Sequence, residues 1–214
     1  RNATGAGLAL PGDQQALVDA VVAVNPRTVV VLIHGSPIAM EHDSIPALLD
    51  AHYPGAMGGP AIADVLSGKY NPCGRLTTMV YPRAFVNRSI FDTGLRSDGG
   101  LTYQHYDGTH GEPLWTFGDG MSYADIDVKP HAAPPPSVAT AALAHAPLTI
   151  AVEVTNAAGP AACHSVLGFI SSDHPEAPRN HKLFDYTRLN LGPGESSIAT
   201  VRLSADTAAL VKKD

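Results

Sequence analysis

The sequence has little that would suit a nucleic-acid or membrane partner. Aromatic residues make up 6% of its 214 residues, charged residues make up 16%, and the formal net charge is −6. Lysine and arginine form no stripe that could follow a phosphate backbone, so we expect no nucleic-acid partner. No run approaches the roughly 18 apolar residues of a membrane-spanning helix, so we expect no membrane partner either.

Cysteine is also scarce, with Cys73 and Cys163 far apart in the sequence. Neither has a CxxC partner or a histidine at zinc-ligand spacing, so we expect no metal site and no cofactor. We interpret the two as buried or free thiols in preference to a disulfide. The histidines show no HExxH pattern or i, i+4 pairing, and most are interpreted as surface or packing residues. They include His105, His110, His131 and His145.

The chain has no apolar leader segment at its start, which reads RNATGAG. It does contain two N-glycosylation sequons, at Asn2-Ala3-Thr4 and Asn87-Arg88-Ser89. On the basis of these sequons we expect a secreted or extracellular protein.

Helix and strand signals alternate in the first part of the chain. The stretch PGDQQALVDAVVAVNP carries Leu17, Val21 and Val24 at helical spacing, which predicts a helix with a wide apolar stripe. Residues 28–33, TVVVLI, are continuously apolar and β-branched, which predicts a strand buried on both faces. A helix, a short turn and a buried strand in series predict a mostly parallel α/β sheet.

Further elements follow up to residue 120. Gly58-Gly59-Pro60 and Gly68 bracket a helix predicted over residues 61–66. The stretch LTTMVY from Leu76 is interpreted as another strand. Residues 89–120 then show no periodicity, and a loop that long in a compact domain usually has a function or wraps another domain.

From residue 121 the pattern changes to short alternating strands with turn signals between them. This pattern predicts an all-β sandwich. A stretch rich in proline and alanine separates the first strand from the rest. The predicted strands are SYADIDV, LTIAVEVTN, CHSVLGFISS, KLFDYTRLNL and SIATVRLS.

The stretch TVVVLIHGSP resembles the strand before the oxyanion loop of a serine esterase. That class also needs a nucleophilic serine on a GxSxG elbow, and the sequence contains none. The nearest match, GDGMSYA, has Ala124 in place of the last glycine and lacks the flanking strand and helix. An esterase is therefore disfavoured, and His34-Gly35 is interpreted as a turn.

Residues 53–76, YPGAMGGPAIADVLSGKYNPCGRL, resemble the signature of the second domain of glycoside hydrolase family 3, with Cys73 in place of the usual serine. Other stretches resemble family motifs in the same order, with Leu101 and Gln104 replacing two arginines. They are LALPGDQQALVDAV, GGLTYQHYDG, PLWTFGDGMSY and LNLGPGES. The resemblance is closest to the branch of β-xylosidases and α-L-arabinofuranosidases.

The resemblance implies a division into two domains. Residues 1–120 would be the C-terminal half of the family's α/β-sandwich domain, with a partial, mostly parallel sheet. Residues 121–214 would be an incomplete all-β, fibronectin-III-like (immunoglobulin-like) sandwich.

The resemblance also implies the activity of a retaining glycosidase that hydrolyses terminal β-linked sugars, as β-xylosidases and β-glucosidases do. Such enzymes act in the catabolism of xylan and other plant cell-wall carbohydrates. The nucleophile, an aspartate in an N-terminal barrel domain, and the acid/base glutamate would both stand upstream of Arg1. We therefore expect no catalytic residue in this chain, no activity of the chain alone, and a carbohydrate substrate and the barrel domain as partners.

Two residues are candidates for binding substrate. Arg1 resembles the arginine of an Asp-Arg pair in the family, and His34 stands where the family commonly has a small residue. For Asp64, Arg75, Asp107, Asp119 and the tyrosines we expect structural roles. An alternative of a different class is a non-catalytic carbohydrate-binding or interaction module that remains after loss of the barrel.

Overall fold

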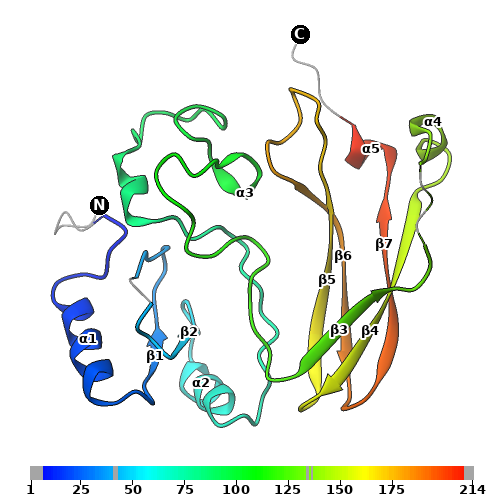
Figure 1. The fold of residues 1–214 in the computed structure, drawn as a ribbon. Coiled ribbons are helices and arrows are strands. Elements are labelled where there is room, and N and C mark those ends of the chain that lie inside the picture. The colour runs from blue at the N-terminus through cyan, green and yellow to red at the C-terminus, as the bar shows by residue number, and fades with distance from the viewer. Residues whose placement is uncertain (1–6, 41–42, 134, 136, 210–214) are drawn as a thin grey trace.

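The computed structural model describes residues 7–40, 43–133, 135 and 137–209 (Figure 1). The helices and strands fall into two neighbouring groups. The α/β part holds elements α1 to α3, and the β part holds strands β3 to β7 with two short helices. None of the helices in these residues is both long and apolar enough to cross a membrane.

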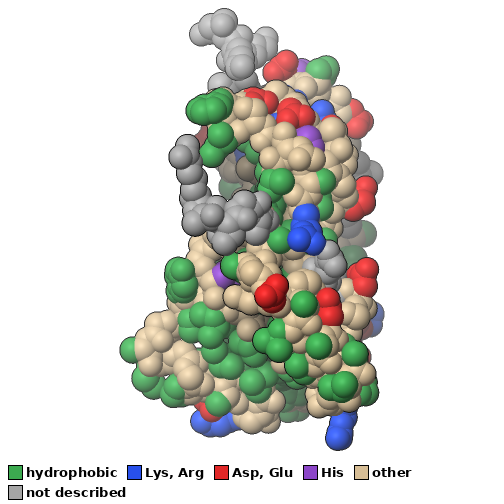
Figure 2. Space-filling view, turned by 90° about the vertical axis from the view of Figure 1, so that its left-hand side faces the viewer, with side chains coloured by type: hydrophobic (Ala, Val, Ile, Leu, Met, Phe, Trp, Pro, Cys, Tyr) green, Lys and Arg blue, Asp and Glu red, His purple; other side chains and the backbone are tan. Residues whose placement is uncertain are grey.

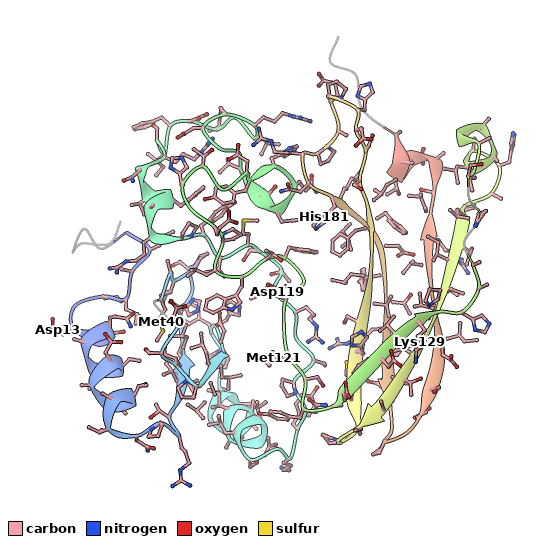
Figure 3. The ribbon with its side chains drawn as sticks, in the orientation of Figure 1. Asp13, Met40, Asp119, Met121, Lys129 and His181 are labelled. Carbon is pink, nitrogen blue, oxygen red and sulfur yellow. The ribbon has the colours of Figure 1, made fainter. Side chains whose placement is uncertain are left out.

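The α/β part is built on two short parallel strands, β1 (Val29–Leu32) and β2 (Ala47–Asp50). They pair in register, from Val29 opposite Ala47 to Leu32 opposite Asp50. Their core joins Leu32 with Leu10 and the fully buried Met40, which Figure 3 labels beside β1. A mixed helix and parallel-strand arrangement of this kind confirms the α/β class.

Helix α1 (Gln14–Val24) forms where the apolar periodicity predicts it, but its apolar stripe lies in solvent. Leu17 is 65% exposed and Val24 is 83% exposed, while Val18 packs against the core of β1 and β2. Figure 2 looks onto this side of the molecule, and hydrophobic side chains gather over its lower half. Strand β1 corrects the expectation of burial on both faces: Leu32 is buried, Val30 and Val31 are half-buried, and Val29 is exposed.

Helix α2 (Gly58–Leu66) confirms the helix predicted there and begins three residues earlier. Gly68 follows its end with φ +75°, in the left-handed region that favours glycine and ends many helices. Gly58 is needed for a different reason. A Cβ at that position would lie 2.5 Å from the ring of Pro54.

The strand predicted from Leu76 is wrong. Residues 77–78 form a bend, and among the described residues the segment's contact with the later segment 114–119 includes one isolated bridge, between Val80 and Trp115. Leu76 N–H donates to the Asp119 carbonyl at 2.8 Å, and Gly118 N–H donates to the Leu76 carbonyl at 2.8 Å. The apolar residues are thus held by a loop that returns to them, and in the described part of the chain β1 and β2 form a sheet of two strands.

The long loop of residues 89–120 forms as predicted. The short helix α3 (Thr102–His105) lies within it, and the 3-10 turn η1 (Arg83–Asn87) precedes it. The loop wraps onto the β part, because Asn180 Nδ2 donates to the carbonyls of Tyr103 and Tyr106 at 2.8 and 2.9 Å. Arg96 adds hydrogen bonds to the carbonyls of Pro175, Glu176 and Ala177.

The β part contains the five strands that the alternating pattern predicts. One antiparallel sheet has the order β3-β4-β7, and a second pairs β5 with β6. The strand bounds are Asp125–Pro130, Leu148–Ala158, Ala162–Ile170, Lys182–Leu191 and Ser196–Leu203 for β3 to β7 in turn. Short helices α4 (Thr140–Leu143) and α5 (Ala205–Ala208) complete it.

One core joins the two sheets of the β part. Val154 of β4, Leu191 of β6 and Ala199 of β7 are nearly inaccessible to solvent and pack together. Hydrogen bonds of the buried Asn71 join the β part to the α/β part. Its amide accepts from Tyr123 N–H at 2.8 Å and donates to the Ala161 carbonyl at 3.2 Å.

Candidate functional site

The carboxyl ends of β1 and β2 lie side by side, at the kind of edge where open α/β sheets usually bind ligands. Three side chains with groups that can bind a ligand or exchange a proton meet there. His34 stands two residues after the end of β1, Asp50 is the last residue of β2, and His52 follows two residues later. This edge is the candidate functional site.

Backbone hydrogen bonds continue the pairing of the two strands into the site. Ala51 N–H donates to the Leu32 carbonyl at 2.9 Å, and His34 N–H donates to the His52 carbonyl at 3.2 Å. His52 has φ +47°, an uncommon conformation for a residue with a side chain. Asp50 Oδ1 accepts from His52 N–H at 3.0 Å and so stabilises this bend.

The three side chains converge on the Asp50 carboxylate. His34 Nε2 lies 3.1 Å from Asp50 Oδ1, and His52 Nδ1 lies 3.6 Å from the same oxygen. The centroids of the two imidazole rings are 5.2 Å apart. His34 is only 9% exposed, and neither of its ring nitrogens makes a hydrogen bond with a described residue. Nε2 nevertheless lies within ion-pair distance of Asp50 Oδ1.

The structure supports the interpretation of His34-Gly35 as a turn. His34 N–H is already donated to the His52 carbonyl, so it is not available to an oxyanion. The ring of Tyr53 covers the turn closely, because a Cβ at position 35 would lie 2.2 Å from that ring. His34 itself faces the edge of the sheet with Asp50, and that placement is what makes it a candidate for binding.

The other predicted residues take structural places. Arg1 lies outside the described residues. Asp64 pairs with Lys69 Nζ at 2.9 Å, and Asp119 accepts from Thr116 N–H at 2.7 Å within its turn. Arg75 donates to backbone carbonyls, including that of Gly74 at 3.0 Å.

Asp107 and the tyrosines of the long loop are also structural. The Asp107 carboxylate pairs with Arg179, and hydrogen bonds from Thr109 hold the pKa of that carboxyl below its usual value. Tyr103 stacks on Phe117 with 4.3 Å between ring centroids. The Asp107–Arg179 pair joins the loop to the β part, and the Tyr103–Phe117 stack lies within the loop.

A second cluster lies where the two parts of the chain meet. Arg188 of β6 donates from Nη2 to Cys73 Sγ at 2.7 Å and from Nε to Cys163 Sγ at 2.8 Å. Both cysteines are free in the structure, and Cys73 is buried. The sequence gives no sign that residues so far apart would share one guanidinium.

The cluster changes the acidity of the two thiols in opposite directions. Burial alone would raise the pKa of Cys73, but hydrogen bonds from Cys163, Tyr70 and Arg188 favour its thiolate and lower that pKa below the ordinary value. Burial, and then the hydrogen bond to Cys73, raise the pKa of Cys163. Cys73 is therefore the more readily ionised thiol of the pair, whereas Cys163 is the more accessible one.

An open cavity of about 440 Å³ lies beside Cys163, away from the His34 edge. Lys69, Asn71, Asn190 and Glu195 contribute to its lining. Glu195 is the only carboxylate among the lining residues. Glycoside hydrolysis uses a pair of carboxyl groups, of which the described lining residues supply one.

Asp50 and His52 were not among the residues singled out from the sequence. A signal for them exists in residues 47–53, ALLDAHY, where an apolar run ends on an acidic residue and a histidine. Parallel pairing of that run with β1 places both beside His34. The second strand has to be recognised before the juxtaposition can be predicted.

Comparison with protein families supports the resemblance seen in the motifs. The profile described as glycosyl hydrolase family 3 C-terminal domain matches residues 3–123, more than half of the chain. The chain belongs to glycosyl hydrolase family 3.

Its relatives are named as β-glucosidases and β-xylosidases. A β-glucosidase of Rhizobium radiobacter is 32% identical, over 91% of this chain and 25% of its own length. A β-xylosidase of Formosa agariphila is 30% identical, over 98% of this chain and 29% of its own length. The chain thus spans between 25% and 29% of the length of these two relatives.

Solved structures show the same fold. A family 3 exo-β-xylosidase (XlnD) in complex with a xylobiose aziridine probe superposes with a TM-score of 0.80 at 24% identity, covering 96% of this chain and 29% of that protein. DesR, a β-glucosidase from Streptomyces venezuelae in complex with D-glucose, has a TM-score of 0.72 at 29% identity, covering 92% of this chain and 26% of that protein.

Proposed function

We propose that this chain is the C-terminal part of a retaining glycosidase that removes terminal β-linked sugars, with xylose as the foremost candidate. The match of the family profile to residues 3–123 carries the proposal. The relatives named as β-xylosidases favour a role in xylan or oligosaccharide breakdown. A carbohydrate is then the substrate, and an N-terminal barrel domain is the partner within the same enzyme.

In this proposal both catalytic carboxyl groups come from outside the chain. Retention requires a nucleophile and an acid/base about 5 Å apart. Asp64, Asp107 and Asp119 are instead engaged by Lys69 or by turns and loops of the chain itself. The chain would contribute one wall of the cleft, with His34 and Arg1 as candidates for contact with the sugar.

The exposed stripe of α1 supports the presence of a covering partner. Leu17, Val21 and Val24 are exposed, and hydrophobic side chains gather on the face that Figure 2 shows. An apolar surface of this kind usually marks an interface. The rest of the α/β sheet and the barrel are the segments that we propose to cover it.

We further propose the division into domains at residues 1–120 and 121–214, with a fibronectin-III-like second domain. Two antiparallel sheets that share one core support it. Secretion belongs to the same proposal. Asn87 of the second sequon is exposed at the end of η1 and is accessible to glycosylation.

The experiment compares two forms of the protein. The form that the gene encodes is expected to hydrolyse p-nitrophenyl β-xyloside and to release the β-anomer first, as NMR of the early product would show. The 214-residue chain alone is expected to show no turnover above a heat-treated control. Turnover by the chain alone would contradict the placement of the carboxyl groups. Absence of glycosidase activity in the encoded form, with sugar binding retained, would favour a binding module instead.

A further inference from the structure

We propose that His34, Asp50 and His52 form a binding site for one divalent transition-metal ion of the zinc class. The proposal concerns the carboxyl edge of β1 and β2 and does not depend on the proposed glycosidase function. It revises the expectation from the sequence, which predicts no metal site because neither cysteine has a partner at zinc-ligand spacing and the histidines show no HExxH or i, i+4 pattern.

The three side chains already have the spacing that a single ion needs. One ligand atom from each residue lies within 4.8 Å of the others. Two ligands bound tetrahedrally to one zinc ion, at about 2.0–2.2 Å each, are separated by roughly 3.3–3.6 Å. The distances from Asp50 Oδ1 to His34 Nε2 and to His52 Nδ1, 3.1 and 3.6 Å, are close to that separation.

The state of His34 gives a second and independent indication. His34 is only 9% exposed, and neither of its ring nitrogens makes a hydrogen bond with a described residue, although Nε2 lies 3.1 Å from Asp50 Oδ1. A buried polar atom without a partner is unfavourable and is rare in folded proteins. An ion bound through Nε2 would satisfy that nitrogen, and the ring faces the other two ligands.

The chemistry of the donors favours transition metals over calcium or magnesium. Two imidazoles and one carboxylate suit zinc, iron(II), cobalt(II) or nickel(II), whereas calcium and magnesium prefer oxygen ligands alone. Three protein ligands leave at least one coordination position open to water. The single negative charge of Asp50 would offset part of the charge of the ion.

The backbone holds the ligands in place before any ion binds. Hydrogen bonds join the segments after β1 and β2, from Ala51 N–H to Leu32 and from His34 N–H to His52. The Asp50 carboxylate also accepts from His52 N–H, which orients the carboxylate toward both rings. The competing interpretation is an aspartate that bridges two histidines with no ion at all.

Cobalt(II) is the probe that distinguishes these interpretations. The protein as the gene encodes it, freed of metal by a chelator, is titrated with Co²⁺ while the visible d–d bands are recorded, and with Zn²⁺ in a calorimeter. We expect one equivalent to bind, with bands typical of nitrogen and oxygen ligands. Zinc is expected to displace the cobalt and to abolish the bands.

The variant His52→Ala is the main test, because the His52 side chain is 64% exposed and its loss should leave the fold intact. It is expected to weaken Co²⁺ binding at least tenfold without changing the melting temperature of the metal-free protein. Asp50→Asn should weaken binding to a similar extent. His131→Ala, which removes an exposed histidine of the β part, is the matched control and should bind as the unaltered protein does.

Two outcomes would overturn the proposal. One is the absence of d–d bands and of binding heat at millimolar Co²⁺ and Zn²⁺. The other is binding that persists unchanged in His52→Ala and Asp50→Asn, which would place the ion elsewhere.

Discussion

Oxidation by glutathione disulfide is expected to join Cys73 to Cys163 and to raise the melting temperature of the protein by about 10 °C or more. Both thiols accept hydrogen bonds from the Arg188 guanidinium, Cys73 from Nη2 at 2.7 Å and Cys163 from Nε at 2.8 Å, which holds the two sulfur atoms near one another. It closes a loop of about ninety residues, which corresponds to roughly 4–5 kcal/mol in the chain-entropy description.

The reaction proceeds in two exchanges. The half-buried Cys163 thiolate first attacks glutathione disulfide and releases one glutathione thiolate. The Cys73 thiolate then attacks the sulfur of Cys163 and releases the second. Intact-mass measurement should show the loss of two hydrogens. Cys163→Ser should show neither the mass change nor the higher melting temperature.

Arg188 controls the second exchange because its guanidinium helps to lower the pKa of Cys73. In Arg188→Leu the pKa of Cys73 is expected to rise. Each unit of that rise reduces the thiolate fraction of Cys73 about tenfold. It also increases the intrinsic nucleophilicity of the thiolate by about half as much on a logarithmic scale. The net result is that the Cys73–Cys163 disulfide forms about threefold more slowly for each unit by which the pKa rises. Arg202→Leu, an exposed arginine of β7, is the matched control and should close at the original rate.

Two results would contradict this prediction. Closure at an unchanged rate in Arg188→Leu would remove Arg188 from the chemistry of the thiols. A protein that keeps two free thiols after prolonged oxidation would show that Cys73 and Cys163 do not approach one another in solution.

Elements with a complete local signal could be predicted from the sequence. Helix α2 has glycines and a proline at its start and Gly68 just past its end. The five strands of the β part show alternating apolar and polar residues, with turn signals between the strands. The stretch LTTMVY has the composition of a strand as well. Whether it forms a strand depends on a neighbouring segment to pair with, and the returning segment 114–119 supplies only an isolated bridge.

The sites depend on juxtapositions that a single sequence does not contain. His34 was recognised because it departs from a family pattern, but Asp50 and His52 become relevant only through the parallel pairing of β1 with β2. Arg188 and Cys73 meet because the long loop and Asn71 dock the two parts of the chain together. Sequence spacing carries information about neighbours within one element, whereas these contacts cross elements.

Replacement of Arg88 by methionine is expected to destabilise the protein by about 3–5 kcal/mol, because it removes one member of a buried network of charge and hydrogen bonds. The Arg88 side chain is 4% exposed and pairs with Asp92 at 3.1 Å. It also donates to the carbonyls of Asp92, Gly94, Ser97 and Asp98, which holds the long loop in a closed turn.

The expected fall in melting temperature is about 10 °C, as measured by calorimetry. Arg27→Met removes an exposed arginine near β1 and is the matched control, for which a change of less than about 0.5 kcal/mol is expected. A fall no larger than that of the control would show that the loop is held mainly by its contacts with the β part.

Arg88→Lys separates charge from geometry. Lysine keeps the positive charge beside Asp92 but lacks the planar fork that reaches several carbonyls at once. If the fork is what closes the loop, lysine should recover only a small part of the lost stability, and hydrogen exchange should remain fast across residues 92–98. Full recovery by lysine would instead assign the effect to the ion pair with Asp92. Because Arg96 of the same loop holds the carbonyls of Pro175, Glu176 and Ala177, opening of the loop should also loosen its contact with the β part.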